Sequence, residues 1–134
     1  MSLEPLILVV EDDSSNQLLV REVLEMAGFR VEVASTSNQA LERLSHLTPA
    51  LILMDVELPG KDGLSLTRLL KSQLPTTAIP IVAMTGHTSL QARGDALEAG
   101  CIGFISKPIE IHTLAARISE FLILATRQDS PETP

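Results

Sequence analysis

The sequence predicts an α/β fold, in which a parallel sheet is covered by helices on both faces. Short aliphatic runs such as Leu51-Ile-Leu-Met54 are apolar at consecutive positions, which is typical of strands buried on both faces. Five strand patterns alternate with five segments of helical periodicity, and this alternation implies right-handed crossovers between parallel strands. The pattern alone leaves the order of the strands in the sheet open.

The first part of the chain predicts two strands and two helices. Residues 6–10 form a uniformly aliphatic strand pattern that ends in Glu11-Asp12-Asp13. Asp13 or Ser14 can cap the helix that follows. Residues 30–34 alternate between polar and apolar, which predicts a strand exposed on one side. The apolar faces of the two helices consist of Leu19, Val20, Val23, Leu24 and Ala27, and of Ala40, Leu41, Leu44 and Leu47.

The central strand, residues 51–54, ends in Asp55 and is followed by turn residues at 58–60 and 62–63. The remaining elements are predicted as a helix around 66–70, a strand at 81–84, a helix at 90–99, a strand at 102–105 and a helix over 111–122. The helix at 90–99 is the weakest, because its apolar residues are mostly small and its internal Gly94 costs about 1 kcal/mol relative to alanine. We expect this helix to be the segment that moves.

Length and composition indicate one soluble domain. The 134-residue chain can bury roughly two thirds of its unfolded surface without disulfides, and its single cysteine, Cys101, fits a reducing compartment. No basic segment leads into an apolar run long enough to cross a bilayer. We therefore expect a cytoplasmic protein that does not bind membranes, with a folded domain over residues 1–125 and a disordered polar tail over residues 126–134.

The composition also argues against a nucleic-acid partner. The formal net charge is -7 and the sequence holds no cluster of lysine and arginine, which contact with a phosphate backbone requires. With no Trp, no Tyr and three Phe, the chain lacks aromatic platforms for single-stranded bases or flat cofactors. The acidic balance favours a metal cation or a basic partner.

Polar residues follow four of the five predicted strands at the point where each strand ends. The carboxyl ends of parallel strands share one edge of the sheet, where ligands bind in open α/β sheets. Helix capping or turn formation alone would favour Asp and Thr at such positions, but a lysine carries the wrong charge for a helix amino terminus. We therefore expect five side chains to meet at this edge: Glu11, Asp12, Asp55, Thr85 and Lys107.

Three carboxylates at one edge repel each other unless positive charge lies between them. Lys107 supplies one such charge, and a hard divalent cation, for which Mg²⁺ is the best candidate, supplies the rest. Asp12 is the expected main ligand, Glu11 helps directly or through water, and Asp55 completes the site. The backbone carbonyl of Glu57 can also reach the cation.

These groups suit covalent capture of a phosphoryl group. Asp55 is ionised at neutral pH and can attack phosphorus without a general base. The cation, Thr85 and Lys107 would then neutralise the phosphoryl oxygens.

At these residues the sequence resembles the receiver domains of two-component response regulators, from about Pro5 to Leu124. The resemblance rests on motifs in the family's order and spacing: Val9-Val-Glu-Asp12, Met54-Asp-Val-Glu-Leu-Pro59 with Asp62-Gly63, Ala83-Met-Thr-Gly86 and Ile105-Ser-Lys-Pro108. It implies a doubly wound, flavodoxin-like three-layer fold with strand order 2-1-3-4-5. It also implies phosphoryl transfer to Asp55 from a histidine kinase or a histidine phosphotransfer protein.

The resemblance further implies a stand-alone regulator, similar to those of motility and cell-division phosphorelays, that binds a downstream protein. Such a protein catalyses only its own phosphorylation and slow dephosphorylation, so we do not expect an enzyme acting on other substrates. The family's switch is carried by Thr85 and an aromatic residue, here Phe104 where tyrosine is commoner. Phe104 cannot donate a hydrogen bond, and a core aromatic is an equally good interpretation. The expected docking surface combines the fourth helix, the fifth strand and the last helix.

Glu57 and His87 lie two residues beyond Asp55 and Thr85. We hypothesise that they flank the path of the water that attacks the acyl phosphate and so set its lifetime. Two solvated loop side chains would explain the same residues equally well.

Three other interpretations use similar residues. A phosphohydrolase of the haloacid dehalogenase kind places its aspartate nucleophile after the first strand and needs a cap domain, for which the length leaves no room. A flavodoxin-like electron carrier needs a hydroxyl-rich phosphate loop where the acidic residues 11–13 would repel phosphate. A receiver-like adaptor would act without phosphorylation, and the intact Asp12, Asp55, Thr85 and Lys107 argue against it.

Overall fold

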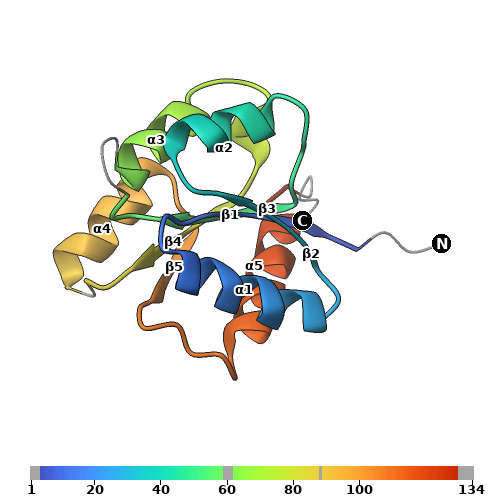
Figure 1. Cartoon of the computed structure of the whole chain (residues 1–134). Helices are drawn as coiled ribbons and strands as arrows, with labels where there is room; N and C mark the ends of the chain where they lie inside the picture. The colour runs from blue at the N-terminus through green and yellow to red at the C-terminus, as the bar shows by residue number, and fades with distance from the viewer. Residues whose placement is uncertain (1–3, 59–61, 88, 130–134) are drawn as a thin grey trace.

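The computed structural model describes residues 4–58, 62–87 and 89–129. Within these residues the predicted alternation of strands and helices is confirmed (Figure 1). The strands are β1 (Leu6–Val10), β2 (Arg30–Ala34), β3 (Leu51–Asp55), β4 (Ile81–Thr85) and β5 (Gly103–Ser106). The helices are α1 (Ser14–Met26), α2 (Ser37–Leu44), α3 (Gly63–Lys71), α4 (Leu90–Ala99) and α5 (Leu114–Asp129), with a 3₁₀ turn η1 (Thr76–Ala78) before β4.

The strands form one parallel sheet in the order β2-β1-β3-β4-β5. This confirms the doubly wound fold and the strand order that the family resemblance implies. In the register of the sheet, Asp55 pairs with Met84 and Thr85 pairs with Ser106. The carboxyl ends of β3, β4 and β5 therefore lie at the same level of the sheet.

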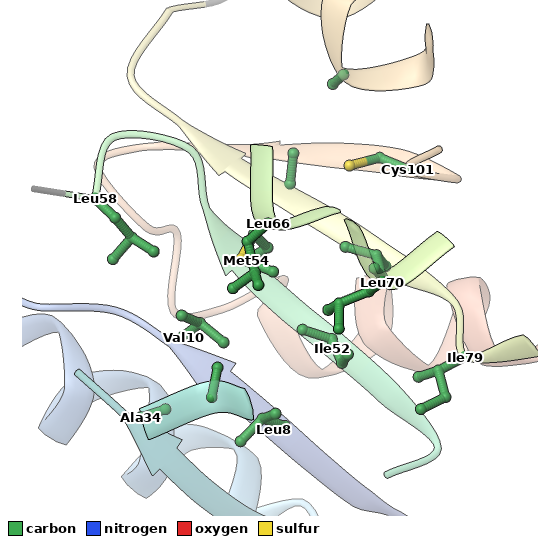
Figure 2. Packing of buried hydrophobic residues seen from close by; sticks show 14 residues of the cluster. Leu8, Val10, Ala34, Ile52, Met54, Leu58, Leu66, Leu70, Ile79 and Cys101 are labelled. Atoms are coloured by element: carbon green, nitrogen blue, oxygen red, sulfur yellow. The ribbon is translucent and has the colours of Figure 1, made fainter. Parts of the chain in front are cut away.

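Helices cover both faces of the sheet, with α2 and α3 above it, α1 and α5 below it and α4 beside α3 at the left (Figure 1). Alternate residues of each strand pack into the two layers. Leu8 and Val10 join the cluster on the α2–α3 side (Figure 2), whereas Ile7 and Val9 join the cluster on the α1–α5 side. Burial of each such side chain contributes about 1.5–3 kcal/mol, which explains why the strands are apolar at consecutive positions.

Several element boundaries differ from the sequence predictions. Helix α2 ends at Leu44, before the predicted apolar Leu47. Helix α5 begins at Leu114, and Ile111, which the pattern assigned to its apolar stripe, is exposed. Both residues match the helical spacing by chance, and they lie in the connecting segments. Pro59 and Gly60, part of the predicted turn after β3, lie outside the described residues.

The predicted domain boundary at residue 125 needs a correction. Helix α5 continues through 126–129, so these four residues are helical and do not belong to a disordered tail. Ala125 is buried, and the Thr126 hydroxyl donates to the carbonyl of Leu122 at 2.9 Å within the helix. The rest of the predicted tail, 130–134, lies outside the described residues.

A search of the described helices finds none with the length and apolarity that a membrane span requires.

Candidate functional site

The predicted polar residues meet at the carboxyl edge of the sheet. Glu11 directly follows β1, Asp55 is the last residue of β3, Thr85 is the last residue of β4, and Lys107 directly follows β5. The Lys107 amide donates to the carbonyl of Thr85 at 2.8 Å, which holds the end of β5 against the end of β4. The parallel topology therefore brings these side chains together from distant parts of the sequence.

Lys107 lies between two buried carboxylates. Its Nζ is 3.2 Å from Glu11 Oε1 and 3.1 Å from Asp55 Oδ1. Glu11 is 0% exposed and Asp55 1%, whereas the Lys107 side chain keeps 19% of its surface accessible. One ammonium thus serves both acids in a site that is largely withdrawn from water, where ionic interactions are stronger than in solvent.

Burial and neighbouring charges also shift the pKa values of Glu11 and Lys107. Desolvation raises the pKa of Glu11, and the nearby charge of Asp55 raises it further, against the opposing effects of a backbone hydrogen bond from Asp13 and of Lys107. Desolvation lowers the pKa of Lys107, but its hydrogen bonds and charge interactions with Asp55 and Glu11 outweigh burial, so this pKa is raised. The ammonium of Lys107 therefore stays charged at neutral pH.

The three carboxylates form a possible cation site. Glu11, Asp12 and Asp55 each place one oxygen within 4.8 Å of the others. Glu11 Oε2 accepts a hydrogen bond from the Asp13 amide at 3.0 Å, and Glu11 Oε1 lies 3.2 Å from the Lys107 ammonium. A donor set made only of carboxylate oxygens fits a hard divalent cation such as Mg²⁺.

The turn after β3 fixes the carboxylate of Asp55. The amide of Glu57 donates to Asp55 Oδ1 at 3.0 Å, and the amide of Val56 donates to the carbonyl of Met84 at 2.9 Å. Oδ1 is therefore held by both the Glu57 amide and Lys107. The role of the Glu57 carbonyl as a metal ligand stays a prediction.

Thr85, Glu57 and His87 form a polar group at the carboxyl edge, in which the side chains of Glu57 and His87 are exposed. The Thr85 hydroxyl accepts from the His87 amide at 2.9 Å and has two possible acceptors, Glu57 Oε2 at 3.3 Å and the His87 carbonyl at 3.2 Å. His87 Nε2 lies 3.5 Å from Glu57 Oε2. The two residues predicted to tune the site thus touch each other, and Glu57 also contacts Thr85.

Phe104 is half-buried and contacts two arginines that the sequence interpretation missed. The guanidinium of Arg93 lies 4.7 Å from the centre of its ring, and Arg117 Nη2 donates to its backbone carbonyl at 3.1 Å. A cation over an aromatic face is stabilising. No sequence signal indicates this contact, because it joins α4 to β5 across the tertiary structure.

Gln17 is another residue that the sequence interpretation missed. Its side-chain amide donates to the backbone carbonyl of Glu11 and to the Ser35 hydroxyl, the latter at 2.9 Å. These bonds fix the turn between β1 and α1, which carries Glu11 and Asp12. In the sequence, Gln17 resembles any polar residue on the outer face of an amphipathic helix.

The sequence matches the family model of the response regulator receiver domain over residues 7–119. Among curated relatives, it is 30% identical to the DNA-binding transcriptional regulator NtrC of Klebsiella pneumoniae over 92% of this chain, and the chain spans 26% of the length of that relative.

Two solved structures are similar over nearly their whole length. The CheY-like response regulator receiver domain protein of Methanospirillum hungatei has a TM-score of 0.84 at 27% identity, covering 94% of this chain and 99% of that one. The receiver domain of the sensor histidine kinase PA1611 from Pseudomonas aeruginosa has a TM-score of 0.80 at 30% identity, covering 90% and 98%, and was solved with a magnesium ion coordinated in its active-site cleft.

Proposed function

Because the chain belongs to the family of response regulator receiver domains, which accept phosphoryl groups in two-component signalling and work with histidine kinases, we propose that Asp55 is its phosphoacceptor. One observation carries the proposal. Among the carboxylates at the carboxyl edge, Asp55 ends the central strand β3 and has one oxygen held both by the Lys107 ammonium and by the Glu57 amide. The phosphohydrolase and electron-carrier interpretations do not fit this family.

The reaction is a transfer from a phosphorylated histidine of a histidine kinase or histidine phosphotransfer protein. An Asp55 carboxylate oxygen forms a bond to phosphorus while the bond from phosphorus to the donor's imidazole nitrogen breaks, and that nitrogen keeps the electron pair. Lys107, 3.1 Å from Asp55, would neutralise charge on the phosphoryl oxygens, and Thr85, at the end of the neighbouring strand β4, would donate a hydrogen bond to them. The chain acts on itself in this scheme and is not an enzyme for other substrates.

Glu11, Asp12, Asp55 and the Glu57 carbonyl are the groups that would hold Mg²⁺. When bound, the ion supplies positive charge for the phosphoryl oxygens. Glu11 and Asp12 provide carboxylate oxygens from the β1–α1 turn, and Gln17 holds that turn at the carbonyl of Glu11. Lys107 keeps Glu11 and Asp55 from repelling each other before the ion arrives.

Phosphorylation would change partner binding through Thr85, Phe104 and the face formed by α4, β5 and α5. Two features support this part of the proposal. A cavity of about 270 Å³ is lined by Thr85 and by Ala92 and Ala96 of α4, so there is open space between the end of β4 and this helix. Leu90 and Leu97 of α4 are largely exposed, as expected of a face that receives a downstream protein.

Glu57 and His87 would set the lifetime of the phosphoryl group. The 3.5 Å contact between their side chains beside Thr85 supports a shared role at the entry for water. Removing either side chain should then change the rate of dephosphorylation, and equal rates in Glu57→Ala, His87→Ala and the wild type would mean that both are ordinary solvated side chains.

The decisive experiment is incubation with a small-molecule phosphodonor, with and without Mg²⁺, followed by peptide mass mapping. We expect one phosphoryl adduct on the peptide that contains Asp55, dependent on Mg²⁺ and absent from Asp55→Asn. An adduct elsewhere would refute the assignment of Asp55. No adduct on the wild type would favour an adaptor that works without phosphorylation.

A further inference from the structure

Helix α3 begins in direct contact with the backbone of Asp55. Its first residue, Gly63, is buried, and a methyl group added there would overlap the carbonyl oxygen of Asp55. The same methyl group would lie 2.9 Å from the carbonyl carbon of Asp55 and 3.0 Å from Cα of Val56. These atoms belong to the backbone and cannot rotate away as a side chain could.

Hydrogen bonds at both the amide and the carbonyl of Gly63 hold its contact with the Asp55 backbone. The Gly63 amide donates to the carbonyl of Val56 at 3.1 Å, and the Thr67 hydroxyl donates to the carbonyl of Gly63 at 2.8 Å. Thr67 is fully buried. The first turn of α3 is thus connected to the backbone after Asp55 and is fixed internally by a buried hydrogen bond.

The buried side chains in the rest of α3 make it difficult for the helix to move away from Asp55. Leu66 and Leu70 are fully buried in the cluster drawn in Figure 2, and close-packed interiors resist displacement. A side chain at position 63 would therefore move the peptide between Asp55 and Val56 at least as much as it moves α3. Such a shift would displace the Asp55 carboxylate relative to Lys107.

We propose that Gly63 is a positioning residue for the phosphoacceptor: the absence of a side chain lets α3 set the backbone of Asp55, and the Thr67 hydroxyl supports that contact. The inference rests on the proposed function of Asp55. It adds two residues that touch neither the phosphoryl group nor the cation. Thr67 acts through Gly63, and Gly63 acts through the Asp55 peptide.

The first test is the rate of phosphorylation of Gly63→Ala by a small-molecule phosphodonor in saturating Mg²⁺. A misplacement of about 1 Å can cost roughly 100-fold in rate, so we expect a loss of about that size at saturating donor. The donor concentration for half-maximal rate should stay within about twofold of the wild-type value, because the substitution displaces Asp55 and does not change donor binding.

Two glycines provide matched controls for the added methyl group. Gly86 lies in the loop after Thr85 and Gly94 lies within α4, and an added Cβ at either position meets nothing within 4 Å. Gly86→Ala and Gly94→Ala should phosphorylate within about twofold of wild type. Equal losses in Gly63→Ala and Gly86→Ala would mean that any change near the edge slows the reaction, and would overturn the proposal.

A second pair of variants decides the matter if Gly63→Ala does not fold. Thr67→Val keeps the shape of the side chain but removes the donor to Gly63, and we expect a loss of roughly three- to tenfold in rate, which Thr67→Ser restores. Thr126 makes the same bond to the carbonyl four residues earlier on α5, so Thr126→Val is the control and should leave the rate unchanged.

The outcomes separate this inference from the function on which it rests. Absence of any adduct on wild-type protein defeats the assignment of Asp55 itself. A normal wild-type rate together with a folded Gly63→Ala of equal rate, or with a Thr67→Val that matches Thr126→Val, overturns the positioning role alone. Circular dichroism and thermal unfolding, with rates measured well below the unfolding midpoint, establish which variants are folded.

Discussion

Helices α3 and α4 lie side by side on one face of the sheet, but they are held there very differently. Helix α3 places Leu66, Thr67 and Leu70 in fully buried positions, and Lys71 at its end donates to two backbone carbonyls of the following segment. Helix α4 buries only alanines, Ala96 and Ala99. It exposes 85% of Leu90 and 56% of Leu97.

This difference in burial suits the two helices to different roles, one in positioning Asp55 and one in responding to phosphorylation. A helix with large buried side chains is a fixed support, and α3 is the helix that contacts the backbone of Asp55. A helix that buries only small side chains loses little when it shifts, and α4 is the helix that borders the cavity beside Thr85. The proposed phosphoryl transfer thus takes place next to α3, the more tightly packed helix. The proposed change in partner binding involves α4, the less tightly packed helix.

The largest effect should come from removing a buried leucine of α3. Leu66→Ala is expected to lower the free energy of unfolding by about 2–5 kcal/mol, because it leaves a cavity in a close-packed cluster. The matched variant in α4, Leu97→Ala, should change it by less than about 0.5 kcal/mol. Urea unfolding followed by circular dichroism measures both, and similar losses would contradict the contrast between the helices.

The thiol between the two helices should make stability depend on pH in the alkaline range. Burial raises the pKa of Cys101 from 9.0 to about 11, despite opposing effects of Thr67 and Lys71. Its folded-state pKa lies above the unfolded value, so its contribution is fully present below pH 9 and is lost as the pH rises toward about 11. The loss should reach roughly 2–3 kcal/mol.

The measurement is the free energy of unfolding of wild type and of Cys101→Ala between pH 8 and pH 11. The wild type should lose more stability over this range than the variant does, since the other titrating groups are common to both. Parallel curves would show that the thiol ionises equally well in the folded and unfolded states.

Magnesium should raise the free energy of unfolding through the carboxylates at the carboxyl edge. An ion that binds only the folded state adds about 1.4 kcal/mol at ten times its dissociation constant. Asp12→Asn should reduce this gain, because Asp12 belongs to the carboxylate cluster. Asp95→Asn removes a carboxylate of α4 outside that cluster and should leave the gain intact; a gain that is insensitive to Asp12→Asn would place the ion elsewhere.

The smallest expected effect is a gain of about 1 kcal/mol in the free energy of unfolding for Gly94→Ala. Alanine is the better helix former, and its methyl group would enter open space. Amide hydrogen exchange in α4 should slow at the same time, while exchange in α3 stays unchanged. Destabilisation by this substitution would mean that α4 is already as constrained as α3.

Most of the fold and the meeting of the site residues could be predicted from the sequence. Continuous aliphatic runs indicate buried parallel strands, and parallel strands bring their carboxyl ends to one edge, so Asp55 and Lys107 could be placed together before any coordinates. The strand order could not be derived from the pattern, because crossover handedness does not say which strands are neighbours; it came from the family resemblance.

Contacts that depend on exact packing could not be predicted. The motif around Gly63 was visible in the sequence, but its approach to the Asp55 carbonyl depends on how α3 seats on the sheet. The stacking of Arg93 on Phe104 joins two elements whose separation no spacing reveals. The polar residues 126–129 predict a tail, whereas α5 continues through them to Asp129.

The position of Lys107 between the buried Glu11 and Asp55 determines the charge balance of the site. In formal charges, the carboxylates of Glu11, Asp12 and Asp55 sum to three negative charges and Lys107 offsets one of them, which leaves two. A doubly charged ion would balance them, and a monovalent ion would not. In the proposed function, such an ion would lower the repulsion that a negatively charged phosphoryl donor meets at these carboxylates.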